Sequence, residues 1–209
     1  MQMHYIDITI PLSGKTPVFP GDPEIGFEPL VKDGYRITSI CISSHSGTHV
    51  DAPSHYIERG RNVDKIPLES LNGDSEVIDL TEIAPVSGYI EKDDVFGESE
   101  GVKIIVLKTG FSWKSSSMDH YLSISPECAE YLADCGATCI VTDAPSIEAY
   151  DGDGTVHRIL LGRDVYIIEM ADLSGVSPGR YHLCAMPLKL EGCDGSPVRA
   201  VLLPCTKEI

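Results

Sequence analysis

The chain has 209 residues, of which 42% are hydrophobic and 23% are charged, an ordinary composition for a globular protein with a substantial core. Its 32 acidic residues against 16 lysines and arginines give a formal net charge of −16, which argues against nucleic acid and anionic membrane surfaces as partners. No stretch approaches the ~18–20 consecutive apolar residues that span a bilayer, and the N-terminus lacks a secretory signal pattern. We expect one domain over residues 1–209.

The seven cysteines include no Cys-x-x-Cys pair, and their number is odd. Such a set makes neither a disulfide framework nor a four-thiolate zinc site. We therefore expect reduced and mostly buried thiols in a cytoplasmic protein.

The first half of the chain predicts mainly strands. His4–Leu12 alternates loosely between apolar and polar residues and predicts a strand. Thr16–Pro23 is a Pro- and Gly-rich loop that carries the aromatic Phe19. Tyr35–Ser44 is rich in β-branched residues and predicts a strand that runs directly into a histidine-rich segment. Two short apolar runs predict buried strands at Glu76–Leu80 and Lys103–Leu107.

The second half predicts helices among further strands. Ser125–Gly136 is the strongest helix, because Ser125 can cap its start, Pro126 suits its first turn and Gly136 can end it. Shorter helical turns are expected at Lys92–Phe96 and His157–Gly162. Strands are expected at Thr138–Thr142, Val165–Met170, Tyr181–Met186 and Val198–Leu203. Strands outnumber helices, so we predict a mixed α/β domain with sheet layers and helices packed on one side.

Three of the seven histidines and one aspartate fall within eleven residues, as His45, His49, Asp51 and His55. Imidazole and carboxylate groups together suit Zn²⁺, Mn²⁺ and Fe²⁺. A straight strand would hold His45 roughly 20 Å from Asp51, and the local composition disfavours a helix. The remaining solution is a strand that ends near His45 and curls, with Gly47 supplying the unusual backbone angles. The curl would bring His45, His49 and Asp51 to one metal, with His55 just beyond it.

Three protein groups leave a catalytic metal incomplete, so further ligands are expected from elsewhere in the chain. His157 and Glu169 are the candidates. Glu169 ends an apolar strand, where a carboxylate is costly unless it is paired or bound to metal. A salt-bridged or edge-strand carboxylate is an equal alternative for that residue. The remaining histidines lack ligand-type neighbours and are expected to be ordinary ones: His4, His120 and His182.

The segment His45–His55 resembles the HxGTHxDxPxH signature of the cyclase superfamily, which includes bacterial kynurenine formamidase and isatin hydrolase. The likeness continues in four other segments, at residues 17–23, 109–113, 142–148 and 187–200. Phe111 stands where this superfamily frequently has tryptophan, and Glu148 replaces an aspartate.

The resemblance implies a swivelling β/β/α-type layered domain with a mixed sheet, assembled as a homodimer or homotetramer. It also implies two divalent metals per chain, zinc or alternatively manganese, with five ligands: His45, His49, Asp51, His157 and Glu169. Asp51 would bridge the two ions. His55 would act as general acid and base without binding metal.

The expected reaction is hydrolysis of an amide-like bond in a small aromatic substrate by a metal-activated water. His55 would give a proton to the leaving nitrogen. Phe19 would form an aromatic wall for a planar substrate, or would equally serve as a partly buried anchor of its loop. Two alternatives stay open. One is a hydrolase or cyclase that acts on a lactam or lactone ring, and the other is a non-catalytic metal-binding protein of the same fold.

Overall fold

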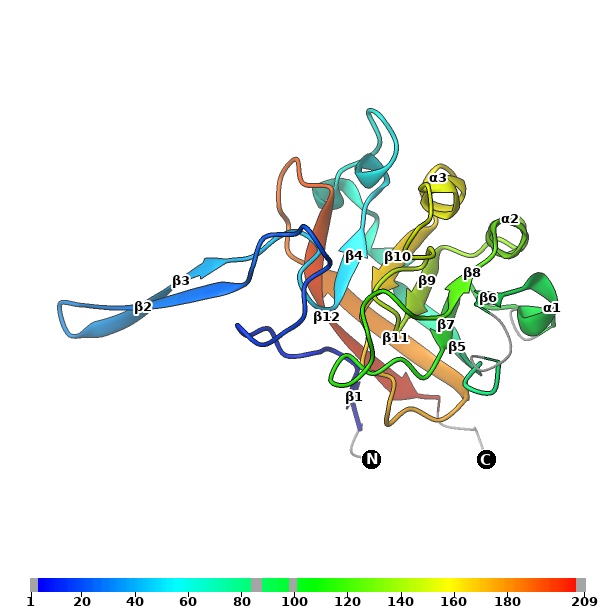
Figure 1. Ribbon diagram of the computed structural model, residues 1–209, viewed down its shortest axis with the longest axis horizontal. Coiled ribbons are helices and arrows are strands. Elements are labelled where there is room, and N and C mark those ends of the chain that lie inside the picture. Colours follow the sequence, from blue (N-terminus) through cyan, green and yellow to red (C-terminus); the bar gives the residue numbers. More distant parts are fainter. Residues whose placement is uncertain (1–3, 84–87, 98–100, 206–209) are drawn as a thin grey trace.

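The computed structural model describes residues 4–83, 88–97 and 101–205 (Figure 1). Its main sheet has eight strands in the order β1-β12-β11-β5-β7-β9-β10-β4, and β4 also pairs with β12, so that the sheet closes on itself like a barrel. Strands β5, β7, β9 and β10 run parallel to their neighbours within this group, whereas the other pairs are antiparallel. The strand bounds are β1 (Ile6–Asp7), β4 (His49–Asp51), β5 (Asn72–Asp79), β7 (Ile104–Lys108), β9 (Cys139–Thr142), β10 (Tyr166–Glu169), β11 (Gly179–Pro187) and β12 (Gly195–Pro204). The prediction of a mixed α/β domain with a mixed sheet is confirmed.

The three α-helices of the described residues lie together on one side of the barrel (Figure 1): α1 (Lys92–Val95), α2 (Pro126–Asp134) and α3 (Thr155–Leu161). Helix α2 begins as its sequence predicts, because Ser125 Oγ accepts a hydrogen bond from the Cys128 amide at 3.2 Å. It ends before Gly136, whose φ of +82° is the left-handed conformation that glycine favours. The remaining elements are β2 (Gly26–Lys32), β3 (Tyr35–Cys41), β6 (Tyr89–Ile90), β8 (Ser123–Ile124) and the 3₁₀ turns η1 (Pro53–His55), η2 (Val63–Lys65) and η3 (Leu68–Ser70).

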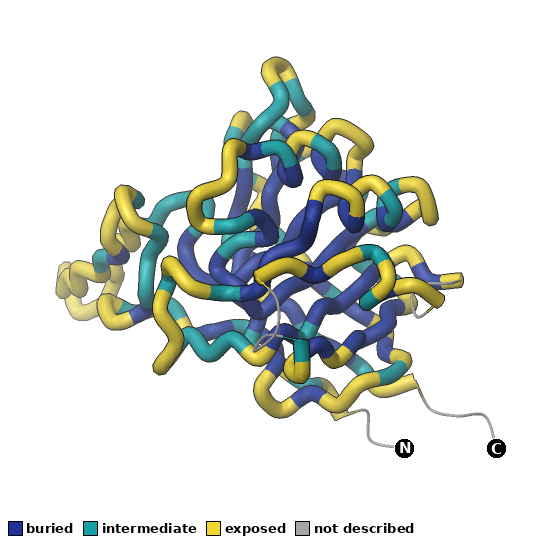
Figure 2. The backbone as a smooth tube through the Cα atoms, turned by 45° about the vertical axis from the view of Figure 1, so that its right-hand side comes forward, coloured by how far each residue is buried: buried dark blue, intermediate teal, exposed yellow. Residues whose placement is uncertain are grey.

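Two hydrophobic cores lie on opposite faces of the central strands. Ile104 and Val106 of β7 belong to the core inside the barrel, whereas Ile105 and Leu107 belong to the core beneath the helices, with Leu132 of α2. Alternate residues of a strand point to opposite faces, so a strand covered on both faces must be apolar throughout. This explains the short apolar runs of the sequence and the buried strands that Figure 2 shows at the centre of the molecule.

The structure departs from the predicted elements mainly near the N-terminus. Only Ile6–Asp7 of the expected strand His4–Leu12 is regular strand, followed by an isolated bridge between Thr9 and Ala171. Strand β3 ends at Cys41, short of the predicted Ser44, and pairs with β2, which was not predicted. Pro29 lies within β2 and masks its strand pattern, because proline is expected only in edge strands.

All seven cysteines are free thiols, but only Cys128 and Cys139 are buried. The expectation that most of them would be buried is therefore wrong. The exposed thiols lie at the ends of elements or in the C-terminal segment, where no core is available: Cys41, Cys135 and Cys205. In the described part of the chain, no helix is both long enough and apolar enough to cross a membrane.

Gly47 turns the backbone between β3 and β4 with a φ of +65°, as its place in the predicted curl requires. A Cβ atom there would also lie 2.5 Å from Leu12 Cδ2. We expect Gly47→Ala to lower the free energy of unfolding by about 1–3 kcal/mol, from backbone strain and crowding together. Gly136→Ala is the control, because Gly136 has a similar φ but open space around it. Chemical denaturation of both variants should give the larger loss for Gly47→Ala, and equal losses would contradict a contribution from crowding.

Candidate metal centre

The pairing of β4 with β10 sets two acidic groups and one imidazole side by side. Val50 and Ile168 point into the barrel core, so their neighbours on each strand project from the opposite face. Glu169 lies opposite His49 in the antiparallel register, and Ile167 lies opposite Asp51. His49 Nε2 is consequently 3.4 Å from both Glu169 Oε2 and Asp51 Oδ1. His49 Nδ1 lies 2.8 Å from the Gly47 carbonyl, which accepts its proton and leaves Nε2 facing the carboxylates.

The bend between β3 and β4 returns His45 to the same centre. Its Nδ1 lies 2.8 Å from Asp51 Oδ1, and its ring meets the His49 ring edge-on with centroids 4.9 Å apart. Thr48 fixes the bend, because its Oγ1 donates to the Met170 carbonyl at 2.7 Å and accepts from the Ile10 amide at 2.9 Å. Sequence alone predicted a curl that unites these groups, and the structure shows that the curl precedes a short strand holding His49 and Asp51.

His157 reaches the centre from helix α3. Its Nε2 lies 3.4 Å from Glu169 Oε1 and 3.7 Å from Asp51 Oδ2. Its Nδ1 lies 2.8 Å from Glu148 Oε2, an arrangement in which the ring N–H donates to the carboxylate and Nε2 is left to bind a cation. The Gly154 amide in turn donates to Glu148 Oε1 at 2.7 Å. The structure thus brings all five predicted ligands together, while their role as ligands stays a prediction.

These side chains fit two divalent cations that share Asp51. Two of the trios whose ligand atoms lie within 4.8 Å of one another contain Asp51, namely His45, His49 and Asp51, and Asp51, His157 and Glu169. Asp51 Oδ2 is buried and has no hydrogen-bond partner among the described residues. A buried carboxylate oxygen without a donor is costly unless a cation faces it. The nitrogen and oxygen donors are those that Zn²⁺ and Mn²⁺ accept.

The charges of the cluster favour a cation as well. Burial by itself would lower the pKa of the His49 imidazole, but hydrogen bonds and charges of Asp51 and Glu169 outweigh burial and raise this pKa to about 10. The pKa values of His45 and His157 rise to about 9 by the same competition, with burial opposed by nearby carboxylates. Burial would raise the pKa of Asp51, yet the histidines hold it well below its usual range. The negative charge of these carboxylates favours protons on the three imidazoles. The same negative charge favours divalent cations in place of those protons.

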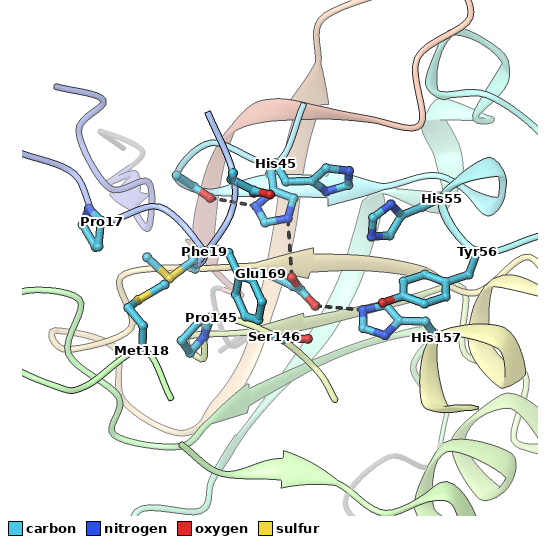
Figure 3. Close-up of a pocket in the computed structure, with 14 residues that line it drawn as sticks. Pro17, Phe19, His45, His55, Tyr56, Met118, Pro145, Ser146, His157 and Glu169 are labelled. Atoms are coloured by element: carbon cyan, nitrogen blue, oxygen red, sulfur yellow. Dashed lines mark hydrogen bonds and ion pairs between the residues drawn. The ribbon is translucent and has the colours of Figure 1, made fainter. Parts of the chain in front are cut away.

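The cluster opens into a cavity of ≈ 190 Å³ (Figure 3). His55 and Tyr56 line one part of it, and Phe19 and Met118 line another. The His55 ring lies 4.1 Å from the His45 ring and 5.9 Å from the His157 ring, centroid to centroid. Phe19 also contacts the Tyr150 ring at 5.7 Å, so it is both a cavity wall and a packed loop residue. The size and lining suit a small molecule with a planar group.

Comparison with known proteins places this chain in a family. The family model described as Putative cyclase matches residues 6–149 of the chain. The chain belongs to the Putative cyclase family.

Relatives that are similar in sequence or in structure cover almost the whole chain. A protein of Salinibacter ruber named kynurenine formamidase is 35% identical over an alignment of 206 residues, and the match covers 96% of this chain and 97% of that protein. A solved structure titled as a potential metal-dependent hydrolase with cyclase activity is 33% identical, covers 97% of this chain and 98% of its own, and has a TM-score of 0.84. The structure of isatin hydrolase A from Labrenzia aggregata covers 96% of this chain and 93% of its own, with a TM-score of 0.83. At 24% identity it shows a shared fold.

Two acidic residues that contact the cluster were not among the site residues predicted from the sequence. Asp194, just before β12, lies 3.1 Å from both His45 Nε2 and His55 Nδ1 through its Oδ2. Ser44 Oγ donates to its Oδ1 at 2.8 Å. The hydrogen bond with His45 is the main cause that holds the pKa of Asp194 below its usual range. The other residue is Glu148, behind His157. Both residues lie in segments that resemble the superfamily, and this resemblance was the one sequence feature that could have marked them as site residues. The residues next to them in the sequence give no indication that they contact the histidines.

Glu148 is expected to set the metal affinity by orienting His157. We expect Glu148→Gln to weaken metal binding about 10-fold, because the neutral amide still accepts a hydrogen bond but no longer balances the imidazole. Glu127→Gln is the matched control, since Glu127 is an exposed glutamate on α2. Competition against a metal-sensitive chelating dye measures both dissociation constants. An unchanged constant for Glu148→Gln would show that this carboxylate does not support the site.

Proposed function

We propose that this protein is a metal-dependent hydrolase that cleaves an amide-like C–N bond of a small aromatic substrate, as a kynurenine formamidase does. The observation that carries the proposal is the position of Asp51, which belongs to both trios of candidate ligands. Its buried Oδ2 has no hydrogen-bond donor among the described residues and faces His157. The relatives named kynurenine formamidase and the neighbour titled as a potential metal-dependent hydrolase support the same activity. Residues 1–209 would act as a single domain.

The proposed metal complement is two Zn²⁺ per chain, with Mn²⁺ as the alternative. One ion would be held by His45, His49 and Asp51, and the other by Asp51, His157 and Glu169. Divalent ions bound there supply Lewis-acid chemistry, by acidifying water for attack and by stabilising negative charge on a substrate carbonyl.

The protein's own part in the reaction centres on His55. It lines the cavity beside the cluster, and Asp194 lies 3.1 Å from its Nδ1, which fixes the ring and leaves Nε2 available to a substrate. Hydrolysis of a formamide adds water across the C–N bond and releases formate and an amine. His55 would take a proton from the attacking water at Nε2 and deliver it to that leaving nitrogen. Phe19 would pack against the aromatic part of the substrate and hold the scissile bond toward the cluster.

Assembly and location form the rest of the proposal. We propose a homodimer or homotetramer, in keeping with the superfamily resemblance. A cytoplasmic location is supported by the seven free thiols, since such thiols persist in reducing compartments.

A substrate panel tests the proposed activity. Protein purified without chelator and supplied with Zn²⁺ or Mn²⁺ would be assayed against N-formyl aromatic amines including N-formylkynurenine, against isatin, and against lactones. The expected result is the highest kcat/KM for an N-formyl aromatic amine, with about two metals per chain by elemental analysis. A preference for isatin or a lactone would favour ring opening. Bound metal without turnover on any member of the panel would favour a non-catalytic metal-binding protein.

A further inference from the structure

The cavity beside the metal centre has two chemically different ends. In Figure 3, Phe19 and Met118 lie on one side of Glu169, whereas His55 and Tyr56 lie on the other side. The end that holds Phe19 is largely apolar, and the aromatic part of the proposed substrate would lie there. What this end can recognise besides a planar ring depends on the few polar groups that reach it.

Asp22 contributes a carboxylate to this end of the cavity. It lines the cavity with Phe19, and the two residues begin and end one tight turn, because the Asp22 amide donates to the Phe19 carbonyl at 3.0 Å. Buried Thr16 anchors the start of the loop, since its Oγ1 donates to the Pro11 carbonyl at 2.7 Å. The Phe19 ring packs on the Tyr150 ring. The aromatic ring and the carboxylate are therefore held in a fixed relation to each other.

The Asp22 carboxylate is free to bind a ligand. The residue is half-buried, and its side chain makes no hydrogen bond or ion pair with another residue that the structure describes. It belongs to none of the trios of candidate metal ligands found among those residues. Covering a carboxylate with a ligand costs free energy unless a positive group pairs with it. A molecule that fills this end of the cavity should therefore carry such a group.

The other charges around the cavity favour a cationic side chain on the ligand over an anionic one. Of the 14 described residues that line the cavity, none is lysine or arginine. The proposed metal centre lies beyond Glu169, where an ammonium group would be repelled. The net charge of −16 attracts cations to the chain and repels anions.

We propose that Asp22 selects the substrate by binding a positively charged amino group on the side chain of its aromatic ring. The substrate class is then an N-formyl arylamine with a cationic side chain. A carboxylate on the same side chain gains no ion pair in the cavity, which distinguishes this class from amino-acid substrates. Phe19 holds the ring and Asp22 holds the ammonium group, so the formamide is directed at the metal centre. The inference rests on the proposed hydrolase activity and names the substrate of that same site.

The test uses three formanilides that differ in one meta substituent, which is aminoethyl, hydroxyethyl or carboxymethyl. The aminoethyl group is protonated at neutral pH, as a lysine side chain is. With wild-type protein supplied with Zn²⁺, kcat/KM for the aminoethyl compound should exceed that for the hydroxyethyl compound about 10-fold or more, and the carboxymethyl compound should be the poorest. Asp22→Asn should reduce the ratio of the first two values to about one, because the amide carries no charge. Asp22→Glu should recover part of the ratio.

The matched control is Glu24→Gln, since Glu24 is an exposed carboxylate of the same segment that does not line the cavity. It removes the same charge two residues away and should keep the wild-type ratio. An equal loss in Glu24→Gln would show that the general field of the acidic surface selects the cation, and the role of Asp22 would be wrong. A wild-type ratio near one, or an unchanged ratio in Asp22→Asn, would also overturn the proposal.

Binding of the amine products gives a measurement that needs no turnover. By titration calorimetry, meta-(aminoethyl)aniline should bind the wild-type protein about 10-fold more tightly than meta-(hydroxyethyl)aniline, and the difference should vanish in Asp22→Asn. If this difference is found while no formanilide is hydrolysed, the hydrolase proposal fails and the Asp22 subsite stands. Equal dissociation constants, or no detectable binding of the cationic amine, would overturn the Asp22 subsite even in an active hydrolase.

Discussion

The His55→Ala variant is expected to retain its metal and to lose between about 100-fold and 10,000-fold in kcat/KM. The proposed role of His55 is proton delivery, and its ring contacts the cluster from outside the two trios that share Asp51. Removing the imidazole therefore takes away the acid and leaves the proposed ligands in place. Elemental analysis and steady-state kinetics on the best substrate of the panel would measure the two effects together.

The control for this variant is His120→Ala, because His120 is an exposed histidine that does not line the site. It should have wild-type activity and metal content. Loss of metal from His55→Ala is the outcome that would contradict this role. His55, His45 and Asp194 form a third trio with ligand atoms within 4.8 Å of one another, so the geometry also allows His55 to bind metal. If His55→Ala were purified without metal, His55 would be a ligand and the proposed division of roles would be wrong.

The Asp51→Asn variant is expected to lose metal and activity together. Asp51 is completely buried, with Oδ1 2.8 Å from His45 Nδ1 and Oδ2 3.7 Å from His157 Nε2. An amide presents one oxygen without a full negative charge, so it cannot serve both halves of the cluster. The metal content should fall from about two to fewer than one per chain, and turnover should fall more than about 1,000-fold.

Asp143→Asn provides the matched control for the loss of a buried carboxylate. Asp143 is 3% exposed, and it accepts hydrogen bonds from the Thr109 and Gly110 amides, each at 3.0 Å, instead of facing the histidines. Its metal content should match that of the wild-type protein. Full metal occupancy in Asp51→Asn would show that Asp51 does not bridge two ions, and the single-metal form of the site would then have to be considered.

Local sequence patterns accounted for most of the elements near the site. Ser125, Pro126 and Gly136 bracket helix α2, and Gly47 adopts the left-handed conformation in the bend between β3 and β4. Such features depend on neighbours in the chain, so the sequence carries them directly. Where the pattern was ambiguous the prediction failed. Pro29 concealed β2, because nothing local says that this strand lies in a free-standing hairpin, where proline is tolerated.

By itself the sequence determined which groups could form the centre: an imidazole-rich bend with Asp51, a helical His157 and a carboxylate at the end of an apolar strand. Only the tertiary structure decided how they meet. The antiparallel register of β4 and β10 sets Glu169 opposite His49, and the entry into β12 brings Asp194 to His45. A register is selected by which side chains the whole barrel can bury, because a slip of one residue would turn each side chain to the other face. That selection draws on contacts between distant segments, and no single segment of the sequence contains it.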